Sequence, residues 1–252
     1  MSGHSHYATI KRQKGLKDAA KGKIFSKLAK VIQIAVKTGG GMDPDSNAKL
    51  RIVIDAAKRV NMPKDNIERA IKKGVGGGEN LEEVTYEGFG PSGIAVIVEA
   101  ATDNRNRTGQ EFKNLFEKGG GSLAGPGSVA FNFEPKGLLI VKKEGNSEEQ
   151  MLSLIDAGVE DLQEADDAIE AYVAVDKLGE IRDRLQGAGF SVISFEIIQK
   201  PKNLQTINDA NLAKKILGFL DNLENLDDVQ KVFTNINIER EVLDQINSNV
   251  QA

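Results

Sequence analysis

The sequence has no cysteine, and its 252 residues include only two histidines, His4 and His6. The lack of cysteine excludes disulfides, thiolate zinc sites and cysteine nucleophiles, and it is compatible with a reducing compartment. No apolar run approaches the roughly eighteen residues of a membrane-spanning helix, and the N-terminus has no apolar signal-peptide core. We therefore expect a cytoplasmic protein that does not associate with membranes.

Residue types that carry out catalysis are also scarce. A Ser-His-Asp system needs an imidazole held within hydrogen-bond reach of a fixed hydroxyl, and both histidines fall in an N-terminal segment without hydrophobic periodicity. The acid pairs Glu82-Glu83 and Asp166-Asp167 fall beside turn or strand-edge residues, which favours solvated surface over acid–base chemistry. We expect no enzymatic activity, no metal, no cofactor and no small-molecule substrate.

Charge is divided unevenly along the chain. Residues 1–75 hold 17 Lys and Arg against 6 Asp and Glu, whereas residues 76–252 hold 16 against 31. Between Ile10 and Lys30 there are eight basic residues and one acid, Asp18. The formal net charge of −4 conceals this division. It indicates a polyanion-facing N-terminal part joined to a part that avoids polyanions.

Apolar residues at helical spacing predict three helices, behind a flexible arm of residues 1–15. The first helix runs from about residue 17 to 37. The second opens at Asp43-Pro44, since proline suits the first helical position, and ends before Pro63. The third covers about residues 64–73 and is capped by Gly74. The first helix also places a lysine stripe opposite its apolar face: Lys23, Lys27, Lys30 and Lys37.

Strand-like alternation replaces the helical period after a glycine hinge at residues 74–78. Two strands, a helix opened by a capping box of Thr108 and Glu111, and a strand at residues 128–133 make a β-β-α-β unit. Residues 138–198, with a capping box at Ser147 and Gln150, have the β-α-β-β-α-β order of ferredoxin-like domains. A helix and a strand after Pro201 are expected to return and complete the β-β-α-β unit.

The predicted fold class is α+β, with an N-terminal three-helix domain followed by two ferredoxin-like α/β domains, one inserted in the other. A basic helical domain with its flexible arm covers residues 1–75. A discontinuous α/β domain covers residues 79–135 and 201–240. The inserted ferredoxin-like domain covers residues 136–200.

The N-terminal Lys and Arg residues are the sharpest functional signal. A basic arm joined to a helical stripe suits the tracking of a phosphate backbone, with strong, salt-dependent and largely sequence-independent affinity. The ordinary alternative is a solvated helix surface. The candidate nucleic-acid-binding residues here are Lys11, Arg12, Lys14, Lys17, Lys21, Lys23, Lys27, Lys30, Lys64, Arg69, Lys72 and Lys73.

A second candidate site lies at the strand-to-helix corner Asp103–Thr108, where Asn104, Arg105 and Arg107 are clustered. Two arginines flanked by amides can grip phosphates or flipped bases bidentately. Alternatively, Asp103 and Asn104 form an Asx-type turn, and the arginines pair with neighbouring acids.

Val129, Phe131 and Phe133 alternate onto one face of a predicted strand. Aromatic residues on a ferredoxin-like sheet can stack bases, as they do in RNA-recognition motifs. Here the surrounding sequence is acidic, and no basic residues directly precede the aromatic strand as they do in those motifs. We therefore expect these side chains in the core.

Eight short runs, spread in order across almost the whole chain, together carry a family resemblance: Gly3–Ser5, Ala20–Phe25, Gly39–Gly41, Asn61–Ile71, Tyr86–Pro91, Ala95–Glu99, Thr102–Thr108 and Leu226–Gln230. These runs resemble the YebC family of bacterial regulators, which includes PmpR-type transcriptional regulators and a mitochondrial translational activator of cytochrome c oxidase subunit I. One departure is His6-Tyr7, where the family typically has Lys-Trp.

The resemblance implies a three-domain fold, with a helical N-terminal domain and two α/β domains, one inserted in the other. It also implies a non-enzymatic role in gene expression, because the family is described as DNA-binding transcriptional regulators and other members assist translation on the ribosome. The positions that match the family's motifs are Lys11, Arg12, Lys14, Lys23, Lys27, Asn61, Met62, Pro63, Lys64, Asn104, Arg105 and Arg107.

The leading hypothesis is a cytoplasmic, nucleic-acid-binding regulator of the DNA-binding transcriptional type. The alternative within this class is a ribosome-associated translation factor that binds rRNA. Two hypotheses from other classes are an enzyme that uses a cleft between the α/β domains and an interaction scaffold whose basic surface only aids solubility. No segment has the pattern of a base-reading recognition helix, so backbone binding is favoured over sequence-specific readout.

Overall fold

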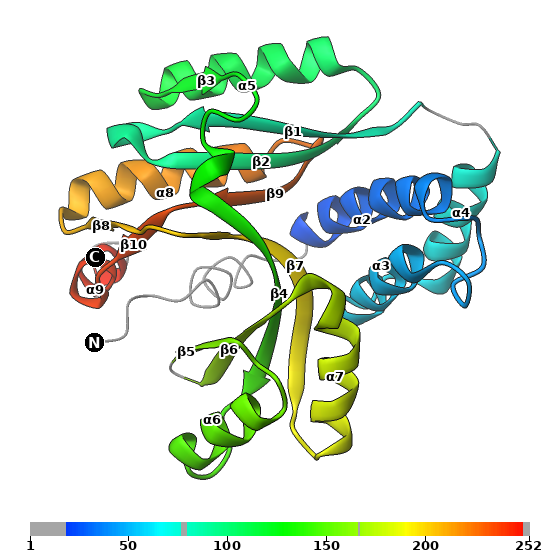
Figure 1. The fold of residues 1–252 in the computed structure, drawn as a ribbon. Coiled ribbons are helices and arrows are strands. Elements are labelled where there is room, and N and C mark those ends of the chain that lie inside the picture. Colours follow the sequence, from blue (N-terminus) through cyan, green and yellow to red (C-terminus); the bar gives the residue numbers. More distant parts are fainter. Residues whose placement is uncertain (1–18, 77–79, 166, 249–252) are drawn as a thin grey trace. The chain divides into compact units, whose positions relative to one another are not determined.

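The computed structural model describes residues 19–76, 80–165 and 167–248 (Figure 1). The predicted arm lies outside these residues. The described residues of 16–129 and 215–232 form one compact unit, called the first unit below. Those of 130–214 and 233–252 form the second unit. No helix in the described part of the chain is long and apolar enough to cross a membrane.

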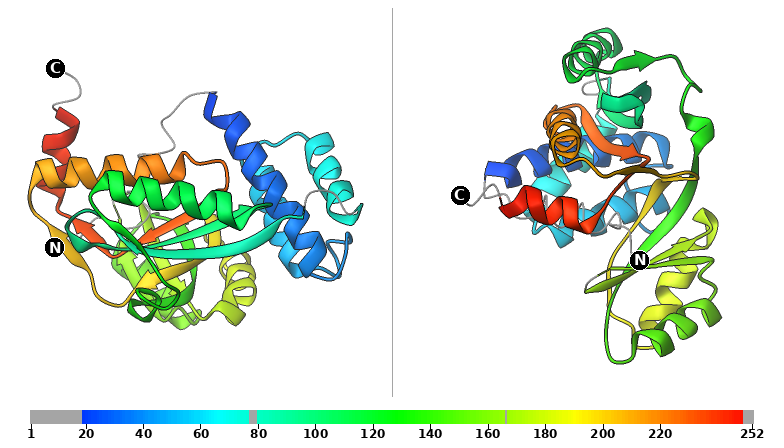
Figure 2. Two further views of the ribbon diagram at one scale, coloured as in Figure 1. Left: turned by 90° about the horizontal axis from the view of Figure 1, so that it is seen from above. Right: turned by 90° about the vertical axis from the view of Figure 1, so that its left-hand side faces the viewer.

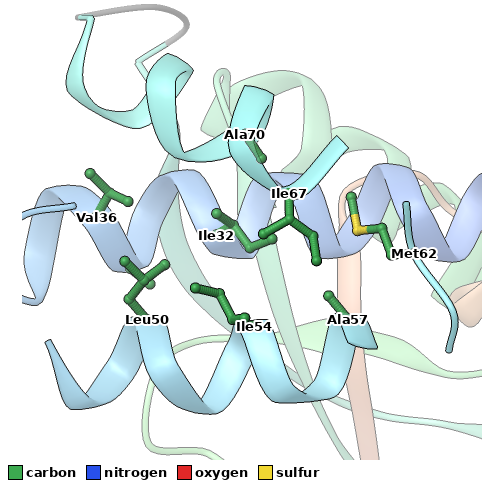
Figure 3. Close-up of a cluster of buried hydrophobic side chains, with 9 residues drawn as sticks. Ile32, Val36, Leu50, Ile54, Ala57, Met62, Ile67 and Ala70 are labelled. Atoms are coloured by element: carbon green, nitrogen blue, oxygen red, sulfur yellow. The ribbon is translucent and has the colours of Figure 1, made fainter. Parts of the chain in front are cut away.

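Three helices open the first unit: α2 (Ala19–Thr38), α3 (Ala48–Arg59) and α4 (Lys64–Val75). Each buries one apolar stripe, and the three stripes meet in a common core. Figure 3 shows Ile32 of α2 facing Ile54 of α3 and Ile67 of α4. Because every helix turns its apolar stripe toward this core, most of the polar residues of the three helices lie on the outside of the bundle.

The second helix begins later than predicted. Residues 43–46 form a turn, and α3 starts at Ala48 with Asn47 as its N-cap. The buried Asn47 side chain accepts from the Leu50 amide at 3.0 Å and donates to the carbonyls of Ala35 and Gly41. The prediction that Pro44 opens the helix is therefore wrong, because a fully bonded asparagine cap satisfies the first amides better.

Gly74 does not cap the third helix. It lies inside α4, where an added Cβ would come within 2.8 Å of Val36 Cβ and 2.9 Å of the Gln33 carbonyl oxygen. The helix ends at Val75, and Gly76 is its C-cap. Glycine at this position lets α4 pack closely on α2, which holds α4 in a fixed orientation.

The sheet of the first unit is built on a hairpin of β1 (Glu82–Phe89) and β2 (Ala95–Thr102), joined through the short turn η1 (Pro91–Gly93). The edge strands are β3 (Ser122–Ala124) and β9 (Val229–Thr234), which give the order β3-β1-β2-β9. Helices α5 (Arg105–Gly119) and α8 (Ala210–Glu224) cover one face of the sheet (Figure 2).

Two local predictions in this region are wrong. Helix α5 begins at Arg105 with Asn104 as its N-cap, so Thr108 and Glu111 do not form a capping box. Residues 128–133 are not a strand: Ala130–Asn132 form a 3-10 turn, η2, and β4 begins at Phe133. The buried Glu87 carboxylate accepts the amides of Gly127 and Val129, which holds this segment as a turn.

The second unit contains β4 (Phe133–Lys142), α6 (Ser147–Asp156), β5 (Asp161–Glu164), β6 (Ala168–Val173), the short turn η3 (Val175–Lys177), α7 (Leu178–Gly187) and β7 (Val192–Pro201). Its strands are antiparallel in the order β5-β6-β4-β7, the ferredoxin-like connection. Strands β8 (Gln205–Ile207) and β10 (Ile236–Ile238) pair in parallel, and α9 (Arg240–Ser248) follows.

The N-cap of α6 also differs from the prediction. Asn146 accepts the Glu148 amide, whereas the Ser147 hydroxyl donates to Glu164. The two sheets also differ from each other in how their strands are connected. The first unit has a hairpin with one additional strand at each edge, whereas the ferredoxin-like order belongs to residues 133–201. The pairs β1–β2 and β1–β3 are antiparallel, as are the strand pairs of the ferredoxin-like sheet.

Candidate nucleic-acid interface

Helix α4 presents the most accessible of the predicted basic residues. Arg69, Lys72 and Lys73 are exposed, and their side chains have no hydrogen bond or ion pair within the described residues. They lie opposite the face that carries Ile67 and Ala70 into the core. The fourth predicted residue of this helix, Lys64, lies 3.6 Å from Glu68.

The lysine stripe of α2 has a different environment. Lys27 Nζ donates to the Glu224 carbonyl at 2.6 Å, and Lys30 Nζ donates to the Asp227 carbonyl at 3.2 Å. Lys23 Nζ donates to the Asn225 carbonyl. These acceptors lie at and just beyond the end of α8, where carbonyls lack helical partners and carry partial negative charge. The lysines therefore cap a helix of their own chain.

Burial lowers the pKa of Lys27 from 10.5 to about 8, and the neighbouring Lys23 acts in the same direction against Glu224 and Asp227. Between these two pH values the native state binds fewer protons than the unfolded chain at this position. The contribution of Lys27 to the free energy of unfolding should therefore rise with pH across that window.

We expect the unfolding free energy of the wild type, relative to that of a Lys27→Met variant, to increase by about 1 kcal/mol from about pH 7.5 to 9.5. This value is reduced to allow for partial solvent screening. Equilibrium denaturation of both proteins at the two pH values measures this gain. A difference in stability that stays constant, or that moves the other way, would contradict the lowered pKa.

Asp228 links three elements of the first unit. Its buried carboxylate accepts from Lys30 Nζ at 2.7 Å, from Arg107 Nη2 at 3.0 Å and from the Thr108 hydroxyl at 2.6 Å. Burial alone would raise the pKa of Asp228, but hydrogen bonds from Lys30, Thr108 and Arg107 outweigh it and lower the pKa to about 2. The carboxylate therefore joins α2 and α5 at the start of β9.

The strand-to-helix corner adopts the second of the two arrangements considered for it. Asn104 Oδ1 accepts the amides of Asn106 and Arg107 at 3.1 Å each. Arg105 Nε lies 2.7 Å from Glu82 Oε1, and Arg107 Nη2 lies 2.7 Å from Asp103 Oδ1. The geometry is an Asx-type cap with both arginines paired to carboxylates.

An open groove of about 550 Å³ runs along this network. Three cations line it, Lys23, Lys30 and Arg107, and so do acids that include Asp227 and Asp228. Opposite charges face one another across the groove, so it does not present a surface of one sign to a ligand.

One further predicted basic residue, Lys21, is exposed on α2. The nucleic-acid role of all the predicted residues stays a prediction.

Sequence reasoning missed the contact between Asp228 and Thr108, because only the fold brings together residues that are 120 positions apart. Asp228 fell in a matched family run, but that run gave no indication of its partners. Four predicted residues lie outside the described part of the chain: Lys11, Arg12, Lys14 and Lys17.

The fold defines an α+β protein whose basic three-helix module is bonded through Asp228 to an adjoining antiparallel sheet. Residues 5–77 match the family model of the TACO1/YebC protein N-terminal domain, and residues 81–236 match that of the TACO1/YebC second and third domain. The chain belongs to the TACO1/YebC family, which confirms the resemblance.

Full-length relatives and a solved structure agree with this assignment. Proteins of Dictyoglomus turgidum and Brachyspira hyodysenteriae, each named a probable transcriptional regulatory protein, are 45% identical to this chain over 250 residues. The alignments cover 98% and 97% of this chain and 100% of each relative. The crystal structure of a conserved hypothetical protein from Aquifex aeolicus is 44% identical, covers 90% of this chain and 94% of that chain, and has a TM-score of 0.83. The α+β fold class is confirmed.

Proposed function

We propose that this protein is a cytoplasmic, non-enzymatic regulator of gene expression that binds nucleic acid through phosphates, and that it acts on DNA as a transcriptional regulator. The observation that carries the proposal is the exposed face of α4, where Arg69, Lys72 and Lys73 have no partners within the described residues. Phosphate oxygens are the ligands that such cations prefer on a polynucleotide.

The packing of α4 supports this role. Gly74 brings α4 close to α2, and Ile67 and Ala70 fix its inner face in the core. A rigid helix presents its cations without a large loss of backbone entropy on binding. The names of the relatives favour DNA as the target, whereas phosphate contacts by themselves are compatible with duplex DNA and with rRNA.

Charge reversal on α4 is the direct test. An Arg69→Glu, Lys72→Glu, Lys73→Glu variant should bind duplex DNA roughly 100- to 1000-fold more weakly at about 0.1 M salt, because each of the three lost phosphate contacts removes up to about tenfold. The slope of log K against log salt should become shallower by about 3. Fluorescence anisotropy with labelled duplex DNA, and in parallel with a structured rRNA fragment, measures both quantities.

A matched control reverses three exposed lysines on other helices: Lys113→Glu, Lys118→Glu and Lys214→Glu. It changes the net charge by the same amount and should weaken binding far less. Equal losses in the two variants would mean that net charge alone governs binding, and an unchanged affinity in the α4 variant would overturn the proposal. Tighter, α4-dependent binding to the rRNA fragment would favour the translational alternative.

A further inference from the structure

Phe131 is the most exposed of the large hydrophobic side chains in the described residues, with 73% of its surface accessible. Its neighbours in the pattern, Val129 and Phe133, are buried at 1% and 4%. The prediction that all three enter the core is therefore wrong for Phe131. The 3-10 turn η2 interrupts the alternation and turns the middle side chain toward solvent.

The turn that carries Phe131 is fixed to a distant segment of the second unit. The Lys202 amide donates to the Asn132 carbonyl at 2.8 Å, and Lys202 Nζ donates to the Phe131 carbonyl at 2.9 Å. The Asn203 side-chain amide lies 3.3 Å from Asn132 Oδ1. These bonds hold the carbonyls of Phe131 and Asn132, so the aromatic side chain projects from an anchored platform.

The groups around the ring match the parts of a nucleotide. An exposed aromatic ring offers a face on which any base can stack. The side-chain amides of Asn132 and Asn203 offer donors and acceptors suited to a base edge. Lys202 is exposed and keeps two ammonium protons beyond its bond to the Phe131 carbonyl, so it can also neutralise a phosphate.

We propose that Phe131 is a stacking site for an unpaired nucleobase of a bound polynucleotide, with Lys202 as its phosphate contact. The proposal rests on the proposed function, because α4 supplies the phosphate affinity to which stacking adds. A base inside a duplex has both faces covered by its neighbours and cannot reach the ring. The site therefore distinguishes single strands, loops and opened duplexes from continuous duplexes.

The absence of tryptophan from the chain allows a direct readout. A Phe131→Trp variant has a single indole, whose fluorescence should be quenched when a base stacks on it. Single-stranded DNA and single-stranded RNA of one sequence, and the fully paired duplex, are the probes. We expect quenching by the single strands and little by the duplex. A Leu152→Trp variant, at a side chain 63% exposed on α6, is the matched control and should not respond.

Affinity provides the second measurement. Phe131→Ala should weaken single-strand binding by roughly 5- to 150-fold, the range for one base stacked on an aromatic ring. The salt slope should not change, because no phosphate contact is removed. Phe131→Tyr should retain most of the affinity, and duplex binding should be the same in all three proteins.

The two proposals fail in different ways. An unquenched indole at position 131, together with an unchanged affinity of Phe131→Ala for single strands, overturns the stacking site and leaves the α4 interface standing. Equal quenching in the control variant also overturns it, because the signal then does not come from the platform. If the wild-type protein binds neither duplex nor single strands, both proposals are overturned.

Discussion

An Asp228→Ala variant is expected to lose about 3 to 5 kcal/mol of unfolding free energy, with a value near the lower end of this range. The substitution removes the shared acceptor of Lys30, Arg107 and Thr108 and leaves the Thr108 hydroxyl and the partly buried Lys30 ammonium without it. Breaking a buried pair by deleting one partner costs this much because the other partner stays desolvated. Guanidinium unfolding followed by circular dichroism measures the loss.

The neighbouring acid supplies the control. Asp227→Ala removes a carboxylate that is 85% exposed and lies 3.7 Å from Lys23 Nζ, so it should cost less than about 0.5 kcal/mol. The deficit of Asp228→Ala should also shrink as pH falls from about 4 to about 2, because the lowered pKa of the native carboxylate makes its contribution disappear there. Equal losses in the two variants would contradict a linking role for Asp228.

A Phe116→Ala variant is expected to lose about 3 to 5 kcal/mol, the range for deleting a buried aromatic ring. Phe116 on α5 is fully buried and meets Phe219 on α8 edge to face, with ring centroids 5.2 Å apart. The ring also fills the space above Gly88 of β1, where an added Cβ would come within 2.5 Å of it. Its removal leaves a cavity between two helices and the sheet. Equilibrium denaturation measures the loss.

The same substitution at Phe131 is the matched control for Phe116→Ala. Because its ring is mostly in water, Phe131→Ala should change the free energy of unfolding by less than about 0.5 kcal/mol. A large loss at position 131, or a small one at position 116, would contradict the assigned burial. A stable Phe131→Ala protein also means that a change in its nucleic-acid affinity does not arise from unfolding.

The lysine stripe of α2 illustrates how the fold changes the interpretation of a charge pattern. Reversing Lys23, Lys27 and Lys30 would place carboxylates against the carbonyls of residues 224–227 and against Asp228. Such a variant would lose the contact with the end of α8 together with any phosphate contact. Arg69, Lys72 and Lys73 of α4 have no such partners among the described residues, so their reversal separates binding from stability.

Local sequence signals predicted most elements of the fold. Helical spacing located α2, α3 and α4, and alternation located β1, β2 and the strands of the ferredoxin-like order. These patterns reflect which face of each element is buried, a property written in a few consecutive residues. The errors lie at element ends, where Asn47, Asn104 and Asn146 cap helices that were predicted to begin at other residues. A cap depends on which carbonyls and amides the rest of the chain brings to it.

By itself, the sequence determined the α+β class, the family and the concentration of positive charge in residues 1–75, because composition and periodicity are local properties. Only the tertiary structure decided which charges are available to a partner. It bonded Lys30 and Arg107 to Asp228, more than a hundred residues away, and left Arg69, Lys72 and Lys73 exposed. It also turned Phe131 out of the core through a single 3-10 turn. Ion pairing and burial depend on distances in space, which residue spacing along the chain does not specify.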